Sequence, residues 1–417
     1  MTSTDARGLR VSGASARALD HCERALAGFL AWTGEPRVQA RHAVEAAPGF
    51  VMGHVLEAQL HLCSRDPADL AVARASIARA RVLPANARER LHVAAAATTL
   101  AGEWDRARAL LGVVLERHPR DLLALAAAHA SDHYLGDVRA LADAVARALP
   151  AWSRADPGFA GVLAMQAFGL EEAGDYPRAE AAAFAALELD PSNLRAHHAR
   201  SHVLEMQGRA AEGLRWMRER ARHWADAGPS STHLWWHLAL HHLDLGDART
   251  ALDVFDRRMG GGSLNELIDA SALLWRLELG GERLGARWAR LAERWAPRAE
   301  EVFCAFNDVH AMIAFVGAGR RDLQRRLLAA QRRRLARGGT NSSMLSAVGH
   351  PASEALRAFG EGRYGRAADL LAALPAVSHR LGGSHAQRGI LGLTYRAALL
   401  GDRHQFPESA KWVPIPN

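Results

Sequence analysis

Two helical stretches carry most of the side chains that could perform chemistry. The first, Thr232–Asp247, reads THLWWHLALHHLDLGD and contains no turn residue before Gly246. Residues three and four positions apart share one face of a helix, which gathers four polar side chains into a stripe: His233, His237, His241 and Asp244. Nearly all the other positions are apolar, and a helix that is apolar almost all round is buried. We therefore expect the stripe to face a polar interior, where its histidines either meet a ligand or form local hydrogen bonds.

The second stretch reads HARSHVLEMQGR and has the spacing His-x-x-x-His-x-x-Glu, which places His198, His202 and Glu205 on one helical face. A carboxylate fixes the tautomer of a neighbouring imidazole, which titrates near neutrality, so this set suits proton transfer. Imidazoles four residues apart can also hold a metal ion. We expect no cofactor, with a metal ion bound by His198, His202 and His237 as the alternative. A hydrogen-bonded polar seam between helices is the purely structural explanation.

Three further segments carry candidate polar residues. In LIDASALLWRLELGG, Asp269 is either a helix N-cap or an inward carboxylate. In FNDVHAMIAFVGAG, His310 and Asp308 could act as base and orienter, although an aspartate is favoured at a helix start in any case. In GGSHAQRG, Arg388 follows His385 and could receive a carboxylate or phosphate, or pair with a neighbouring helix.

Composition and charge exclude several functional classes. The formal charge of +7 comes almost wholly from arginine, and the most basic run, RRDLQRRLLAAQRRRLARGG, keeps its leucines in helical phase without interleaved aromatics. We therefore expect no nucleic-acid partner. The three cysteines have no paired or metal-type spacing, which fits a reducing compartment. No apolar run reaches the roughly 18–20 residues of a membrane span and no signal peptide is visible, so we expect a cytoplasmic protein without membrane contact.

An internal repeat predicts the elements that position these residues. The segment AGDYPRAEAAAFAALELDPSN carries a tetratricopeptide signature, with Gly-Asp-aromatic at the turn and proline at the exit. Turn glycines recur alternately every 34 and 38 residues at Gly102, Gly136, Gly174, Gly208, Gly246 and Gly280. The series continues more loosely at Gly319, Gly362 and Gly401, and is preceded by turns at Gly34 and at Arg65-Asp66. Each unit is predicted to be a helix–turn–helix hairpin that buries its apolar face only against its neighbours.

The predicted fold is an all-α, tetratricopeptide-type α-solenoid, a right-handed and strongly curved superhelix. Residues 16–401 form a single domain of about ten hairpins, residues 1–15 are disordered, and residues 402–417 form an irregular tail that is too proline-rich for a helix. The concave wall of such an array is lined by the first helix of each hairpin. Positions that line it, counted back from each turn glycine, hold His92, His133, His198, His202, Glu205, His233 and Asp244. His237 and His310 share another offset, nine residues before their glycines.

Six segments carry a family likeness. They are AFGLEEAGDYPRAE, HARSHVLEMQGR, HLWWHLALHHLDLGD, DASALLWRLEL, FNDVHAMIAFVGAG and GGSHAQRG, and the resemblance covers roughly residues 20–400. In these segments and their order the chain resembles the tetratricopeptide repeat protein 38 family. The resemblance implies a long helical array, in a family described by fold rather than activity. The matching positions include His198, His202, Glu205, His237, Asp269, Asp308, His310, His385 and Arg388. The chain departs from the family at Gly389, where we expect an acidic residue, at His241, where an aromatic is usual, and in a shorter C-terminal end.

These patterns predict a monomer or homodimer whose concave pocket binds a small polar molecule. We expect acid–base or metal-assisted chemistry of a hydrolase or lyase type, and the catalytic candidates are His202, His237, His310, Glu205 and Asp308. The candidates for substrate binding are His92, His133, His198, His233, Trp236, Asp244, Asp269, His385 and Arg388. The alternative is a non-enzymatic scaffold that binds a peptide or partner protein in its groove, which is the commoner use of such repeats.

Overall fold

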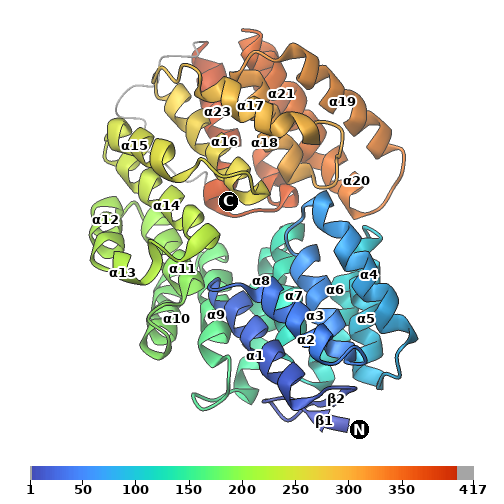
Figure 1. Cartoon of the computed structure of the whole chain (residues 1–417). Coiled ribbons are helices and arrows are strands. Elements are labelled where there is room, and N and C mark those ends of the chain that lie inside the picture. The colour runs from blue at the N-terminus through green and yellow to red at the C-terminus, as the bar shows by residue number, and fades with distance from the viewer. Residues whose placement is uncertain (1, 402–417) are drawn as a thin grey trace. The chain divides into compact units, whose positions relative to one another are not determined.

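Figure 1 shows the computed structural model of the chain, in which residues 2–401 are described. Apart from a short N-terminal strand pair, the regular elements over this range are helical, so the predicted all-α class is confirmed. The predicted irregular tail at 402–417 lies outside the described residues. Among the helices of residues 2–401, none has the length and apolar character that a membrane span requires.

The chain divides into two compact units, whereas the sequence predicted a single domain. Unit 1 comprises Met1–Val203 and Ala221–Ser231, and unit 2 comprises Leu204–Arg220 and Thr232–Asn417. Helices contact chiefly their neighbours in sequence, as with the first and second helices or the ninth and tenth. A chain held together by local contacts has no single central core, so it can divide in this way.

Unit 1 begins with two strands and continues with helical hairpins. Its elements are β1 (Thr2–Thr4), β2 (Arg10–Ser12), α1 (Ala16–Ala31), α2 (Pro36–Ala46), α3 (Val51–Leu62), α4 (Leu70–Val82), α5 (Ala87–Leu100), α6 (Trp104–Arg117), α7 (Leu122–Leu135), α8 (Val138–Ala148), α9 (Phe159–Glu172), α10 (Tyr176–Leu189) and α13 (Ala221–Trp224). Helix α11 (Leu194–Met206) belongs to unit 1 as far as Val203 and to unit 2 from Leu204.

Unit 2 contains the end of α11 and the remaining helices. They are α12 (Ala210–Glu219), α14 (Ser231–Asp244), α15 (Ala248–Arg258), α16 (Leu264–Leu279), α17 (Arg287–Trp295), α18 (Ala305–Gly317), α19 (Arg321–Leu335), α20 (Thr340–Met344), α21 (His350–Gly360), α22 (Tyr364–Leu371) and α23 (His385–Leu400). A π-helical turn, Leu345–Gly349, joins α20 to α21.

The turns between paired helices lie where the glycine spacing placed them. Left-handed backbone, which costs glycine nothing, occurs at Gly34, Gly102, Gly136, Gly174, Gly208, Gly246, Gly319, Gly362 and Gly401. The predicted Arg65-Asp66 turn also has a left-handed residue, Arg65, at φ 55°. One position differs, because Gly280 ends α16 in the right-handed region and Gly281 takes the left-handed place at φ 94°. A two-glycine turn allows this shift of one residue.

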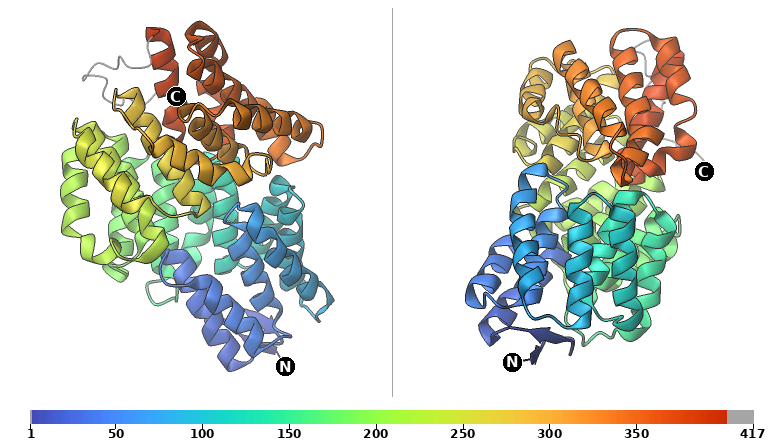
Figure 2. Two further views of the ribbon diagram at one scale, coloured as in Figure 1. Left: turned by 45° about the horizontal axis from the view of Figure 1, so that its top comes forward. Right: turned by 90° about the vertical axis from the view of Figure 1, so that its right-hand side faces the viewer.

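The N-terminal segment is ordered, which corrects the expectation of disorder for residues 1–15. Strand β1 pairs antiparallel with β2, and the pair adjoins the first helices of unit 1 in both views of Figure 2. Between the strands, the buried Arg7 forms an ion pair with Glu23 of α1 at 2.6 Å. The backbone N–H of Ser12 donates to Glu89 of α5 at 2.7 Å. These partners lie 16 and 77 residues away, so local composition could not reveal them.

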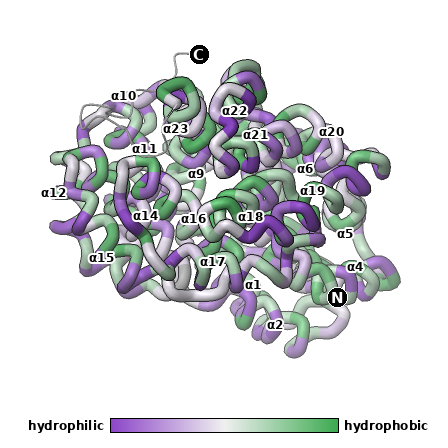
Figure 3. The backbone as a smooth tube through the Cα atoms, turned by 90° about the horizontal axis from the view of Figure 1, so that it is seen from above, coloured by the Kyte–Doolittle hydropathy of each residue, from purple (hydrophilic) through white to green (hydrophobic). Residues whose placement is uncertain are grey.

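Both units bury apolar side chains between paired helices. Hydrophobic and hydrophilic residues alternate along single helices in Figure 3, as amphipathic elements require. In unit 1, Phe50 and Leu56 belong to a fully buried cluster at the N-terminal end. In unit 2, Trp275 of α16 meets the Phe359 ring at 5.7 Å and donates its indole N–H to Thr394 Oγ1 at 2.8 Å. The second contact ties α16 to α23.

Gly317 marks a close approach in unit 2, because a Cβ added there would lie 2.3 Å from the Trp288 ring. We expect Gly317→Ala to lower the free energy of unfolding by about 1–3 kcal/mol, since the ring or the helix must shift. Gly112→Ala in α6 is the control, because a Cβ at Gly112 meets nothing within 4 Å. That change should stabilise by about 0.5–1 kcal/mol. Urea denaturation followed by circular dichroism measures both, and similar effects would contradict the packing argument.

Candidate functional site

Two histidine–carboxylate pairs lie side by side in unit 2. Nδ1 of His237 lies 3.0 Å from Oε2 of Glu205, which comes from the last turn of α11. Nδ1 of His233, one turn earlier on α14, lies 2.9 Å from Oδ2 of Asp269 on α16. The two imidazole rings meet edge to face with centroids 4.9 Å apart. Three helices thus bring together four residues that the sequence predicted as site residues.

Trp236 holds the two imidazoles in place. Its ring stacks on His233 at a centroid distance of 5.3 Å and an interplanar angle of 10°, and it meets His237 edge-on at 4.9 Å. The side chain of His237 is fully buried, whereas that of His233 is 20% exposed. His233 is therefore the more exposed imidazole of the two pairs.

Burial controls the protonation of the carboxyl groups in this cluster. It raises the pKa of Glu205 to about 8, assisted by the charge of Asp244 and opposed by Arg276. It also raises the pKa of Asp244 to about 6, again opposed by Arg276. Glu205 consequently keeps its proton near neutral pH. A protonated carboxyl group within 3.0 Å of an imidazole nitrogen donates a hydrogen bond to it.

Arg276 of α16 belongs to this cluster, although the sequence analysis did not select it. Its guanidinium group lies over the Trp236 ring, 5.5 Å from the centroid. It donates hydrogen bonds to two backbone carbonyls, that of Ala272 at 3.1 Å and that of Ala386 in α23. Arg276 follows Asp269 by seven residues, which is two helical turns and the same face. This spacing is the sequence pattern that could have identified Arg276 as a site residue.

The start of α23 places two further predicted residues near Arg276. Ser384 caps this helix, and His385 precedes the Ala386 carbonyl that Arg276 binds. Arg388 is buried and donates to the carbonyl of Gly383. The predicted alternatives for Arg388, a ligand anion or a neighbouring helix, stay open.

His310 and Asp308 of α18 do not form the predicted base and orienter. Nδ1 of His310 bonds the carbonyl of Phe306 at 2.8 Å. Residues two positions apart point to different sides of a helix, and Asp308 faces Gln331 and Arg334 instead. Burial raises the pKa of Asp308 to about 8. We therefore assign Asp308 to the interior of unit 2 and leave His310 as a catalytic prediction without this orienter.

The next member of the polar stripe on α14 after His237 is His241. His241 is fully buried, and neither ring nitrogen has a hydrogen-bond partner among the described residues. Gly213 of α12 provides the space for this ring, because a Cβ there would lie 2.5 Å from Nε2. Burial lowers the pKa of His241 to about 4. His241 is therefore a neutral residue packed in the interior of unit 2.

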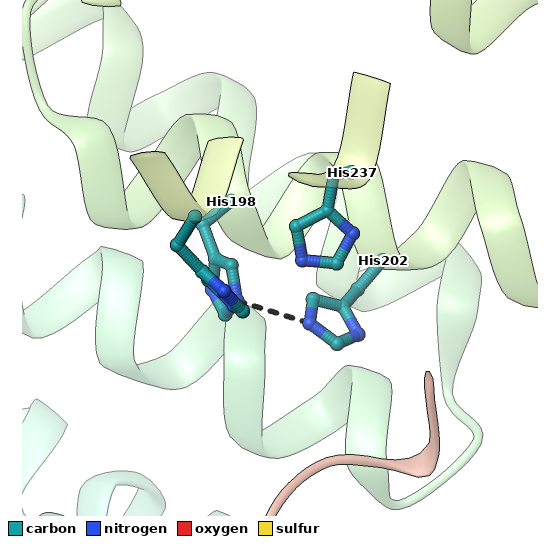
Figure 4. Close-up of side chains that lie close together, drawn as sticks. His198, His202 and His237 are labelled. Carbon is teal, nitrogen blue, oxygen red and sulfur yellow. Dashed lines mark hydrogen bonds between the residues drawn. The ribbon is translucent and has the colours of Figure 1, made fainter. Parts of the chain in front are cut away.

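A second histidine cluster lies in unit 1, around the ring of Phe168. His133, His198 and His202 approach this ring at centroid distances of 5.3, 5.2 and 5.5 Å. The Nε2 atoms of His198 and His202 are 3.0 Å apart and share a hydrogen bond, drawn in Figure 4. The predicted spacing therefore brings these two imidazoles into contact. The convergence of all the predicted histidines on one concave surface stays a prediction.

His202 also belongs to a group that could hold a metal ion. Ligand atoms of Glu171, Glu172 and His202 lie within 4.8 Å of one another, and all three residues are buried. Oε2 of Glu171 is 3.7 Å from Nδ1 of His202. The sequence analysis missed the two glutamates, although Glu171 precedes Gly174 by the same three residues that separate Glu205 from Gly208. The metal set predicted from the sequence, His198, His202 and His237, has members in both units and stays a prediction.

His92 takes part in a hydrogen-bond network inside unit 1, and its role in substrate binding stays a prediction. Its Nε2 bonds Oδ2 of the buried Asp121 at 2.8 Å. Arg88 donates to the same oxygen at 2.5 Å. Burial alone would raise the pKa of the Asp121 carboxyl, but the His92 and Arg88 charges outweigh burial and hold it well below its usual value. His92 is thus part of an internal ion-pair network.

The unit 2 cluster of Glu205, His233, Trp236, His237, Asp269 and Arg276 is therefore the candidate functional site. It combines two imidazoles, each hydrogen-bonded to a carboxyl group, with a guanidinium group, and the carboxyl group bonded to His237 is protonated near neutral pH. No known protein-family model matches the chain.

Proposed function

We propose that this chain is a tetratricopeptide-type helical-repeat protein whose unit 2 cluster binds a small polar molecule and transfers protons to and from it. Paired helices with left-handed turns at the predicted glycines support the repeat arrangement, as does the resemblance to the tetratricopeptide repeat protein 38 family. The observation that carries the functional proposal is the adjacency of the two histidine–carboxylate pairs, His237–Glu205 and His233–Asp269.

The two pairs would hold their protons in opposite ways. Protonated Glu205 donates to Nδ1 of His237, so the neutral imidazole carries its own proton on Nε2 and can donate it. Once His237 has given up its Nε2 proton, Glu205 supplies its own proton to Nδ1. This step leaves a neutral histidine and a glutamate carboxylate. Asp269 instead accepts the Nδ1 proton of His233, so the basic lone pair of this more exposed ring lies on Nε2, the nitrogen that would accept a proton. An acid and a base therefore stand next to each other, as hydrolase and lyase chemistry requires.

A ligand-binding experiment tests this function. Pools of amino acids, sugar phosphates, dicarboxylates and nucleosides are screened by ligand-detected NMR against the wild-type chain and His237→Ala. His42→Ala is the control, because His42 is an exposed histidine of unit 1. We expect binding that His237→Ala weakens at least about tenfold and His42→Ala leaves unchanged. Binding of extended peptides alone, insensitive to His237, would support the scaffold alternative and remove the proposed function.

The pH dependence of any turnover found in this way provides a second test. Glu205 can resupply a proton only while it is protonated, so the rate should fall as the pH rises through about 8. Glu205→Gln keeps the shape and a hydrogen-bond donor but holds no transferable proton. This variant should lose about 10²–10⁴ of the rate and no longer show that alkaline decline. An unchanged pH profile would exclude Glu205 as the proton source.

A further inference from the structure

Arg276 has no carboxylate partner in contact, although it lies inside a cluster of acidic groups. Its guanidinium group contacts the carbonyls of Ala272 and Ala386 and the face of Trp236. Among the described residues, no carboxylate oxygen lies within 4.0 Å of its guanidinium nitrogens. Arginines that serve only to stabilise a fold are commonly paired with a carboxylate when they are buried. The contacts of Arg276 fix the group without neutralising it.

The acidic neighbours of Arg276 act on it from a distance. Glu205 and Asp244 raise its pKa, but burial outweighs them and lowers the value to about 10. Glu205 is itself protonated near neutral pH, and Asp269 is bound to His233. Asp244, with a pKa of about 6, is ionised near neutral pH, but its oxygens do not lie within 4.0 Å of the guanidinium nitrogens, so the charge of Arg276 is balanced only from a distance.

The indole N–H of Trp236 is a second donor without a partner. Trp236 is fully buried, and its Nε1 meets no acceptor among the residues that the structure describes. Leaving a buried donor unpaired costs about 1–3 kcal/mol, so such a group calls for an explanation. A bound molecule with acceptor oxygens near Arg276 would satisfy this donor as well as the guanidinium charge.

We propose that Arg276 and Trp236 form an anion-recognition position, and that the molecule bound in unit 2 carries a carboxylate or phosphate group. Arginine suits planar oxyanions because its rigid fork of N–H groups can make two parallel bonds. Its backbone contacts leave other N–H groups of the fork for such a partner. The anion would lie beside the two histidine–carboxylate pairs, which places the rest of the molecule within reach of His233. This inference rests on the function proposed above and names the class of its ligand.

Calorimetric titration with defined probes tests the inference. Succinate and inorganic phosphate are the two anionic arms, and glycerol and ethylenediamine are the neutral and cationic arms. We expect the wild-type chain to bind one anion, and Arg276→Gln to bind it at least about tenfold more weakly. Arg276→Lys keeps the charge but not the fork, so its affinity should lie between the two. Arg290→Gln is the matched control, since Arg290 is an exposed arginine of α17 in the same unit, and it should bind as the wild type does.

Each outcome bears on the inference in a different way. Circular dichroism of the variants shows whether they are folded. If Arg276→Gln is not folded, the anion affinities of Arg276→Lys and Arg290→Gln are compared instead, and equal affinities would overturn the anion position. Anion binding that persists at full strength in Arg276→Gln would overturn the anion position. Binding of only glycerol or ethylenediamine, weakened by His237→Ala, would overturn it while leaving the proposed function intact. Binding of no small molecule in this titration or in the metabolite screen would overturn both.

Discussion

Asp121→Ala is expected to lower the free energy of unfolding of unit 1 by about 3–5 kcal/mol, because it leaves the buried Arg88 guanidinium group and the buried His92 imidazole without their carboxylate partner. Asp121 is 1% exposed and accepts hydrogen bonds from Arg88, His92 and the backbone N–H of Ala124. The last bond caps α7, so one side chain connects α5 to the start of α7. Urea denaturation followed by circular dichroism measures the loss.

Asp137→Ala provides the matched control for this prediction. Asp137 caps α8 through a bond from Ala140 at the same 3.0 Å, but it is exposed and pairs with no buried cation. Its removal should cost about 1 kcal/mol, the usual effect of losing an N-cap. The contribution of Asp121 comes from a depressed pKa, so it is present above the unfolded value of 3.8 and is lost as the pH falls further. Equal losses for the two alanine variants at neutral pH would show that the buried network adds nothing.

Asp308→Asn is expected to have an effect of opposite sign and to stabilise unit 2 in alkaline solution. Asp308 is 5% exposed, and its Oδ2 has no hydrogen-bond partner among the described residues. Burial raises its pKa from 3.8 to about 8. The folded state therefore binds the proton more tightly than the unfolded state, and the wild type loses stability as the pH rises from 3.8 to about 8. Asparagine has a similar shape and no charge, so it avoids this loss.

The gain for Asp308→Asn should be on the order of 2–4 kcal/mol near pH 8 and should nearly vanish near pH 4. Unfolding curves in urea at the two pH values measure it. Asp322→Asn is the control, because Asp322 is exposed and the hydrogen bond from Arg320 lowers its pKa to about 2. That substitution removes a favourable charge and should slightly destabilise unit 2 at both pH values. A pH-independent effect of Asp308→Asn would show that the buried carboxyl does not titrate as its surroundings indicate.

The sequence by itself determined the helices and their turns. Glycine occupies nearly every left-handed position at the end of a first helix, because other residues pay a steric penalty there. This requirement is local, so the spacing of Gly102, Gly136, Gly174, Gly208 and Gly246 predicted the turns without knowledge of the packing. The N-terminal cap of α23 at Ser384 and the pairing of His198 with His202 are equally local, since each depends on residues within about one helical turn.

The tertiary structure decided which of these side chains meet, and in which protonation state. Counting back from the turn glycines selected both His92 and His237, yet Asp121 engages one in an internal network and Glu205 pairs with the other. The distance in sequence from a turn glycine indicates the face of the helix on which a side chain lies. It does not indicate which residues of the neighbouring helix that side chain contacts.

The distances between helices also set the electrostatics. Burial keeps Glu205 protonated near neutral pH and leaves Arg276 over Trp236 without a carboxylate in contact. The N-terminal strands could not be predicted from the sequence, because their segment is held by Glu23 and Glu89, which come from helices folded against it. A charge acquires its effect from atoms within a few ångströms, and those atoms are brought together only when distant segments pack.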